Sequence, residues 1–246
     1  MPVMSPAALE ERLLYRDGLM LVIDKPAGIA VHRGPKGGEN LEALFSGLRF
    51  GLPRDPSLAH RLDRDTSGCL VLGRHRKALE KLGLLFKQGK IAKTYWAIVE
   101  GGPSADEGLI DLPLARLDAS RGWWMKVAAD GQPAQTRWRV LGRATRDGKD
   151  YCLMALAPLT GRTHQLRVHC AAEGWPILGD CIYGTAARDC AERLQLHARS
   201  IVVPLYKNKD PIRVEAPVPP HMQSNVASFG VAPAEEPASA LLQPLR

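Results

Sequence analysis

Short strand-like segments separated by turn residues recur along this chain of 246 residues. Residues 13–15 and 19–23 flank Arg16-Asp17-Gly18, a pattern typical of two strands joined by a tight turn. Residues 68–72 form a continuous apolar run, as expected of a buried strand. Further strand-like runs lie at 94–99, 136–141, 151–156, 194–203 and 212–215. Together they predict a large, mostly antiparallel sheet.

Helical patterns are fewer and lie between these segments. A short helix is expected around residues 41–48, and the leucine spacing at 77–88 predicts a second that Gly89 can end. A third is expected between Thr163, as N-cap, and Gly174. The fold class is therefore α+β, with one folded domain over residues 1–222. Residues 223–246, rich in Ala, Pro, Ser and Glu, are expected to form a disordered tail.

Composition limits the classes of function that fit the chain. A hydrophobic content of 45% is enough for a substantial core. No stretch approaches the roughly 20 apolar residues that a membrane span requires, and the N-terminus does not resemble a signal peptide. We therefore expect no membrane partner and a cytoplasmic location. The five cysteines include no Cys-x-x-Cys pair, so they indicate neither a disulfide framework nor a zinc ribbon.

The formal net charge of +7 and the pI of about 9.3 favour a polyanionic partner such as nucleic acid. Many basic proteins bind no nucleic acid, so charge supports this class of partner without deciding it.

The segment His60-Arg61-Leu62-Asp63-Arg64-Asp65-Thr66-Ser67-Gly68 directly precedes the apolar run at 68–72. A carboxylate held among guanidinium groups stays ionised, as a nucleophile or base requires. The alternative is a surface turn closed by salt bridges, and composition alone favours that turn.

A second polar cluster, residues 160–169, opens the third predicted helix. Arg162 and the helix N-terminus could hold a phosphate, while Arg167 could reach inward to a buried carboxylate. His164 and His169 are five residues apart, which does not suit two metal ligands on one helical face. The alternative for both histidines is local hydrogen bonding.

Two aromatic pairs could stack on nucleobases. Tyr95 and Trp96 are adjacent on a predicted strand, so one ring faces each side of the sheet, although core packing would explain both. Trp123 and Trp124, flanked by Arg121 and Lys126, could contact RNA or cover a loop.

Residues 60–68 resemble the signature of the RluA-type family of RNA pseudouridine synthases. Other segments agree in the same order: residues 22–28 resemble the family's first motif and 93–95 its tyrosine motif. The third motif corresponds to residues 160–169 with 177–180, and residues 194–198 and 215–217 also fit. The resemblance spans roughly residues 13–220.

The resemblance implies a pseudouridine synthase α+β fold, in which a bisected antiparallel sheet has flanking helices and a central RNA cleft. It implies isomerisation of uridine to pseudouridine by base flipping, without metal or organic cofactor. Many relatives carry an S4-type domain before the catalytic domain, whereas only about a dozen residues precede the first strand here. A stand-alone catalytic domain resembles members that modify transfer RNA or small stem-loops of ribosomal RNA. We expect the protein to be a monomer.

The resemblance also assigns site residues. Asp63 would be the catalytic aspartate, Tyr95 would stack on the uracil, and Arg167 would pair with Asp63. Arg61 would enter the space that the flipped uridine leaves, and Leu196 would pack against the base. His60 and Thr66 would support the motif, and His60 would also take part in binding the substrate.

The chemistry leaves two routes open, because Asp63 can attack C1′ or remove the 2′ proton. Two other functions also remain open. One is a non-catalytic RNA-binding or RNA-folding protein on the same fold. The other, which the residues favour less, is a hydrolase with Asp63 as nucleophile and Asp65 as its neighbouring carboxylate.

Overall fold

The computed structural model describes residues 4–34, 37–118, 123–187 and 192–230, in two compact units. The first unit comprises residues 1–91 and 198–217, and the second comprises residues 92–197 and 218–246. Among the described residues, no helix is long and apolar enough to cross a bilayer. Each unit is built on antiparallel strands, as the sequence predicts.

The first unit has the strand order β1-β2-β4-β11, with β3 paired to β4 and β12 paired to β11. Its elements are α1 (Pro6–Glu10), β1 (Leu13–Arg16), β2 (Met20–Lys25), η1 (Leu41–Leu48), β3 (Ser57–Leu58), β4 (Ser67–Gly73), α2 (Arg76–Lys87), β11 (Leu196–Val203) from residue 198 onward, and β12 (Ile212–Glu215).

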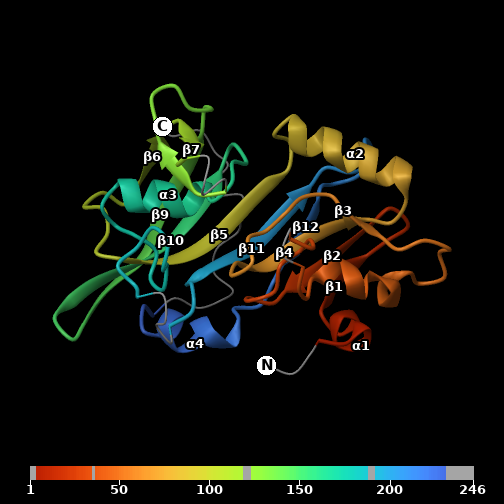
Figure 1. Ribbon diagram of the computed structural model, residues 1–246, viewed down its shortest axis with the longest axis horizontal. Helices are drawn as coiled ribbons and strands as arrows, with labels where there is room; N and C mark the ends of the chain where they lie inside the picture. The colour runs from red at the N-terminus through yellow and green to blue at the C-terminus, as the bar shows by residue number, and fades with distance from the viewer. Residues whose placement is uncertain (1–3, 35–36, 119–122, 188–191, 231–246) are drawn as a thin grey trace. The chain divides into compact units, whose positions relative to one another are not determined.

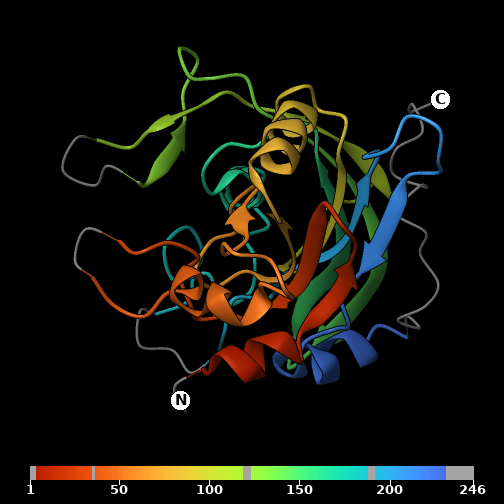
Figure 2. The ribbon, with the colours of Figure 1, turned by 90° about the vertical axis from the view of Figure 1, so that its right-hand side faces the viewer.

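Both faces of β2 and β4 are covered by helices. Figures 1 and 2 show α2 on one side of these strands and α1 with η1 on the other. Val22 and Val71 pack with Leu82 of α2 in one cluster, while their neighbours Ile23 and Leu70 are equally inaccessible. Because alternate residues of a strand face opposite sides, a strand buried on both faces is apolar throughout. This explains the continuous run at 68–72.

The second unit has the strand order β5-β10-β9-β6, with β7 and β8 as a separate hairpin. In the core of the second unit, Trp96 and Leu153 pack with Met222 and Val226, which belong to α4 (Pro220–Ala227). Its elements are β5 (Ala92–Glu100), β6 (Glu107–Asp111), β7 (Leu114–Arg116), β8 (Met125–Val127), β9 (Gln135–Arg146), β10 (Lys149–Pro158), α3 (Gln165–Ala172) and α4 (Pro220–Ala227).

The predicted strands are all present, with ends within a few residues of the structure. The segment 41–48 is a 3-10 helix rather than an α-helix. The prediction of a disordered tail from residue 223 is wrong for its first part, because α4 continues to Ala227 and buries Val226. Residues 231–246 lie outside the described residues.

Candidate active site

The predicted catalytic segment forms a turn at the start of β4 in the first unit. The Thr66 N–H donates to the Asp63 carbonyl at 3.2 Å, which closes the turn. Asp63 is half-buried, whereas Arg61 and Arg64 are exposed. The buried Thr66 Oγ1 has no hydrogen-bond partner among the residues that the structure describes. The turn therefore presents Asp63 at the protein surface with a guanidinium on either side in sequence.

Residues 25–28 hold this turn through its backbone. The Gly28 N–H donates to the Arg64 carbonyl at 2.9 Å, and Arg64 Nε donates to the Gly28 carbonyl at 3.1 Å. Lys25 is fully buried, and its Nζ donates to the carbonyl oxygens of Pro26, Arg64 and Thr66, each at 2.9 Å. Two of the sequence motifs thus form a single structural unit around the turn that carries Asp63.

Lys25 is a residue whose role the sequence did not reveal. Burial lowers the pKa of Lys25 to about 7, against the opposing effect of Asp65, Asp63 and Asp24. A buried ammonium must be paired or fully hydrogen-bonded, and the three carbonyls meet that need. The sequence marks Lys25 only indirectly, by the resemblance of residues 22–28 to a family motif and by its place at the end of a buried strand, directly before a proline.

Replacing Lys25 with Met is expected to lower the free energy of unfolding by about 1–3 kcal/mol, because three buried carbonyls lose their donor. Urea denaturation followed by circular dichroism measures this change. We expect a larger loss than for Lys77→Met, which alters an exposed lysine of α2. Equal stability of the two variants would show that Lys25 does not hold the turn.

Gly68 and His60 fix the two ends of the catalytic segment. Gly68 has a φ of +104°, and a Cβ there would lie 2.3 Å from the Ala198 carbonyl oxygen of β11, so only glycine fits. His60 Nε2 accepts the Val71 N–H at 3.0 Å, and its ring lies 4.7 Å from the Phe86 ring. The structure therefore gives His60 a supporting contact, and its predicted part in substrate binding stays a prediction.

Arg167, in the second unit, forms a buried bidentate ion pair with Asp180. Arg167 Nε and Nη2 donate to the two carboxylate oxygens at 2.7 Å each, and the side chains are 5% and 1% exposed. Burial by itself would raise the pKa of Asp180. The Arg167 guanidinium and the N–H groups of Ile182 and Tyr183 have the larger combined effect, so the pKa of Asp180 is lowered. The expected inward pairing of Arg167 with a buried carboxylate is confirmed. Its pairing with Asp63, which belongs to the first unit, stays a prediction.

Gln165 organises the polar segment before α3. Its Oε1 accepts the Thr160 hydroxyl at 2.7 Å and the Arg162 N–H at 3.0 Å, and its Nε2 donates to the Gln135 carbonyl. These bonds hold the chain in a sharp turn. The N-cap of α3 is His164, with a φ of +53°, and the helix begins at Gln165. The prediction of Thr163 as N-cap is therefore wrong.

Arg162 is half-buried, and its Nε donates to the Pro133 carbonyl at 3.0 Å. Its predicted contact with a phosphate stays a prediction.

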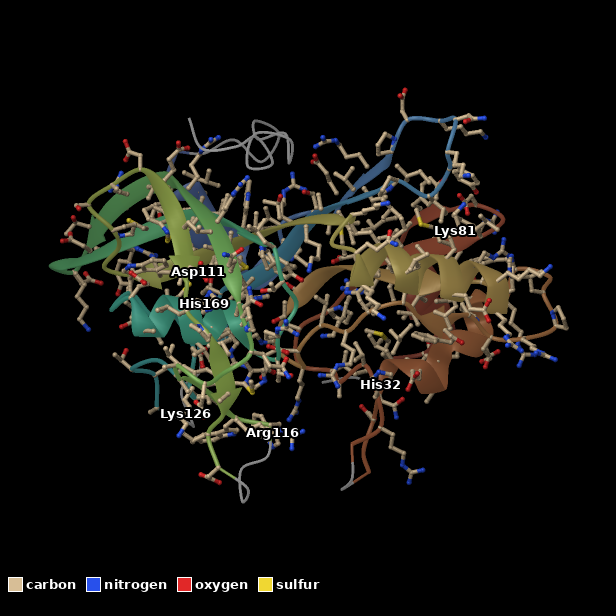
Figure 3. All side chains as sticks on the ribbon, turned by 90° about the horizontal axis from the view of Figure 1, so that it is seen from above. His32, Lys81, Asp111, Arg116, Lys126 and His169 are labelled. Carbon is tan, nitrogen blue, oxygen red and sulfur yellow. The ribbon has the colours of Figure 1, made fainter. Side chains whose placement is uncertain are left out.

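Both histidines of this region form hydrogen bonds within the protein, but with residues distant in the sequence rather than with local groups. His164 Nδ1 lies 2.8 Å from the Tyr183 hydroxyl. His169 Nδ1 lies 2.9 Å from Thr136 Oγ1 and its Nε2 lies 3.0 Å from the Leu112 carbonyl oxygen. Figure 3 shows His169 close to Asp111, but burial has the larger effect and lowers the pKa of His169. Within the described ranges, no group of three or more His, Cys, Asp or Glu residues could hold a metal ion.

Tyr95 and Trp96 point to opposite faces of β5, as predicted. Trp96 packs in the hydrophobic core, whereas Tyr95, at 9% exposed, shares the other face with Lys93 by strand alternation. Burial lowers the pKa of Lys93 to about 8. Leu196, the first residue of β11, is 2% exposed. Core packing therefore explains Trp96, whereas the tyrosine ring lies on the opposite face of the strand.

Trp123 is the most exposed of the large hydrophobic residues described, at 56%. Its ring makes edge contacts with Trp124 and His164, at centroid distances of 5.7 and 5.4 Å. Figure 3 shows Arg116 and Lys126 on the same β7–β8 hairpin. Arg121, the other predicted flanking cation, lies outside the described residues. This hairpin therefore combines an exposed aromatic ring with positive charge.

Comparison with known proteins assigns the family. Residues 19–172 match the family model described as RNA pseudouridylate synthase. An uncharacterized RNA pseudouridine synthase of Zymomonas mobilis is 45% identical over 86% of this chain and 95% of its own length. The ribosomal large subunit pseudouridine synthase C of Haemophilus ducreyi is 35% identical over 91% of this chain and 70% of its own.

The fold agrees with this assignment. The solved structure of human RNA pseudouridylate synthase domain containing 4 matches with a TM-score of 0.74 and 26% identity, covering 92% of this chain and 95% of that one. The fold and the ordered motifs therefore define an RNA-modifying isomerase. The chain belongs to the RNA pseudouridine synthase family, of the RluA and RluC type, and isomerises uridine in RNA.

Proposed function

We propose that this enzyme converts specific uridines of ribosomal or transfer RNA into pseudouridine, with Asp63 as its essential carboxylate. The observation that carries this proposal is the turn at 63–66, which Lys25 and Gly28 hold through backbone hydrogen bonds. Such fixed geometry suits a group that must meet a reacting atom. A surface turn stabilised only by salt bridges would not need a buried lysine beneath it.

The reaction exchanges one glycosidic bond for another. The bond from N1 of the uracil to C1′ breaks, the base rotates, and C5 then bonds to C1′ while its proton is lost and N1 gains one. Asp63 begins the exchange as the carboxylate, either by attack on C1′ or by removal of the 2′ proton. Atoms and electrons balance without an external oxidant, reductant or group donor, and we propose that no metal or organic cofactor takes part.

The other site residues are proposed to hold the flipped nucleotide. Flipping a base costs a few kcal/mol, and stacking on an aromatic ring offsets about 1–3 kcal/mol of it. Tyr95 supplies that ring and Leu196 an apolar contact for the base. The exposed Arg61 enters the vacated space in the RNA. His60 supports the motif, and Arg162 contacts a phosphate.

The RNA target is proposed from the relatives. The relative from Haemophilus ducreyi is named for the ribosomal large subunit, which supports a stem-loop of that RNA. Transfer RNA is the second target class. We further propose that the enzyme is a monomer and works in the cytoplasm, where these RNAs are processed.

Site-resolved mapping of pseudouridine in ribosomal and transfer RNA tests the target. A site that disappears in a deletion strain, and returns with the wild-type gene, identifies the uridine. The purified protein should form pseudouridine at that site in a transcript. Release of free uracil would instead support a hydrolase, and tight binding without either product would support a non-catalytic RNA-binding protein.

Replacing Tyr95 with Phe is expected to lower turnover by about a hundred-fold, because the hydroxyl takes part in the late removal of the C5 proton. RNA affinity should be retained, since the ring still stacks on the base. Single-turnover assays together with filter binding separate the two effects. Turnover near the wild-type value would reject a role for the hydroxyl and leave the stacking role intact.

A further inference from the structure

The outer face of α2 carries a net positive charge, because its one carboxylate, Glu80, pairs with Arg76 and the exposed lysines of the helix remain. Ala78 and Leu82 are buried in the first unit, and His75 caps the helix N-terminus by accepting the Ala78 N–H at 3.3 Å. The opposite side of α2 and the two nearby loops expose a set of cations, which we call the α2 basic face: Lys77, Lys81, Lys87, Lys90, Lys207 and Lys209. Lys207 and Lys209 lie in the connection between β11 and β12.

Tyr206 brings the helix and the loop together. Lys81 Nζ lies 5.6 Å from the centroid of the Tyr206 ring, and Lys209 Nζ lies 5.1 Å from it. Figure 3 shows Lys81 on α2. A single aromatic ring thus contacts two ammonium groups that come from different elements. Each contact is favourable by itself, but the two like charges oppose each other.

No carboxylate among the described residues forms an ion pair with Lys81 or Lys209. The nearby Asp17 is already engaged: its Oδ2 accepts the hydroxyls of Tyr206 and Tyr15 at 2.9 Å each. Its Oδ1 accepts two backbone N–H groups at 2.7 and 2.8 Å. Asp17 therefore fixes the ring without forming an ion pair with either lysine, and an anion from outside the protein would relieve their mutual repulsion.

One end of α2 contacts the catalytic motif. Phe86, in the last turn of α2, contacts the ring of His60, the first residue of the segment that carries Asp63. Lys81 precedes Phe86 by five residues, or about 7.5 Å along the helix axis. The end of α2 that carries Lys87 therefore adjoins the segment that holds Asp63.

We propose that the α2 basic face is a second RNA-binding surface, which holds the phosphate backbone of the stem beside the modified nucleotide. Phosphate contacts require no particular base, and a row of lysines on a helix suits a regular backbone. This surface rests on the proposed function for its substrate, but it adds affinity outside the residues that touch the uridine.

The test uses the full chain with Lys81 and Lys209 both replaced by Gln. Fluorescence anisotropy with a labelled RNA hairpin gives Kd over a range of salt concentrations. The slope of log Kd against log salt should fall by about two, because two phosphates would no longer be neutralised by lysine. At low salt the Kd should be about ten-fold weaker, and KM should rise in parallel.

The matched control replaces Arg54 and Lys149 with Gln, two exposed cations outside the α2 basic face. Its slope and Kd should equal those of the wild type. A slope in the Lys81/Lys209 variant equal to that of this control would overturn the proposal. So would a loss confined to binding of phosphatidylglycerol vesicles, which would assign the surface to membranes. Absence of pseudouridine in the wild-type reaction would reject the proposed function. The slope of log Kd against log salt would still test the RNA-binding role of the α2 basic face, because it is measured by binding alone.

Discussion

Replacing Asp63 with Asn is expected to lower pseudouridine formation by at least about a thousand-fold, because the reaction loses the only group proposed to start the bond exchange. The amide has nearly the shape of the carboxylate, so the turn should keep its backbone hydrogen bonds to Lys25 and Gly28. RNA affinity should change little. Single-turnover assays on the mapped transcript and anisotropy with the same RNA give the two quantities.

Asp65→Asn is the matched control, since Asp65 is an exposed carboxylate of the same turn. It should retain most of the activity. Loss of activity in both variants would point to the turn rather than to Asp63 alone. Unchanged pseudouridine formation by Asp63→Asn would reject the proposed role, and the non-catalytic RNA-binding protein would then become the better interpretation.

Replacing Asp180 with Asn is expected to lower the free energy of unfolding by about 3–5 kcal/mol, because the buried Arg167 guanidinium would lose the carboxylate that accepts two of its N–H groups. The pair is bidentate and almost wholly inaccessible, at 5% and 1% exposed. Urea denaturation measures the loss. The control is Glu80→Gln, which breaks the exposed pair of Glu80 with Arg76 on α2 and should change stability little.

The double variant Arg167→Met with Asp180→Leu should recover most of that stability, because it removes both charges together. If the single and double variants were equally destabilised, the cost would come from packing rather than from an unpaired charge.

The pH dependence follows from the same pair. The pKa of Asp180 is lowered in the folded protein, so its contribution to stability is complete above the ordinary value of about 4 and is lost as the pH falls through the folded value. The difference between wild type and Asp180→Asn should therefore shrink in acid.

Much of the fold could be predicted from the sequence because local patterns determine it. The turn residues mark the hairpin at β1 and β2, a continuous apolar run marks the buried strand β4, and the leucine spacing marks the amphipathic helix α2. The tail shows the limit of this reasoning. Composition predicted disorder from residue 223, yet Met222 and Val226 are enough to dock α4 on the core.

The sequence motifs predict which residues belong to the candidate site, but not which residues they contact in the structure. Asp63 and Arg167 stand in recognisable segments, but Asp180 as the partner of Arg167 depends on tertiary packing. Lys25 is the clearest case, because a lysine in a sequence is ordinarily read as a surface residue. Only the three carbonyls that converge on its Nζ reveal its position.

Lys25 also makes the catalytic turn chemically observable. A lysine amine reacts with acylating reagents only where the reagent can reach it, and that of Lys25 is 0% exposed and bonded to three backbone carbonyls. Its modification requires the turn to separate from residues 25–28. The rate of acylation at Lys25, followed by peptide mass spectrometry, therefore reports how often the segment that carries Asp63 opens locally. Bound RNA should lower this rate.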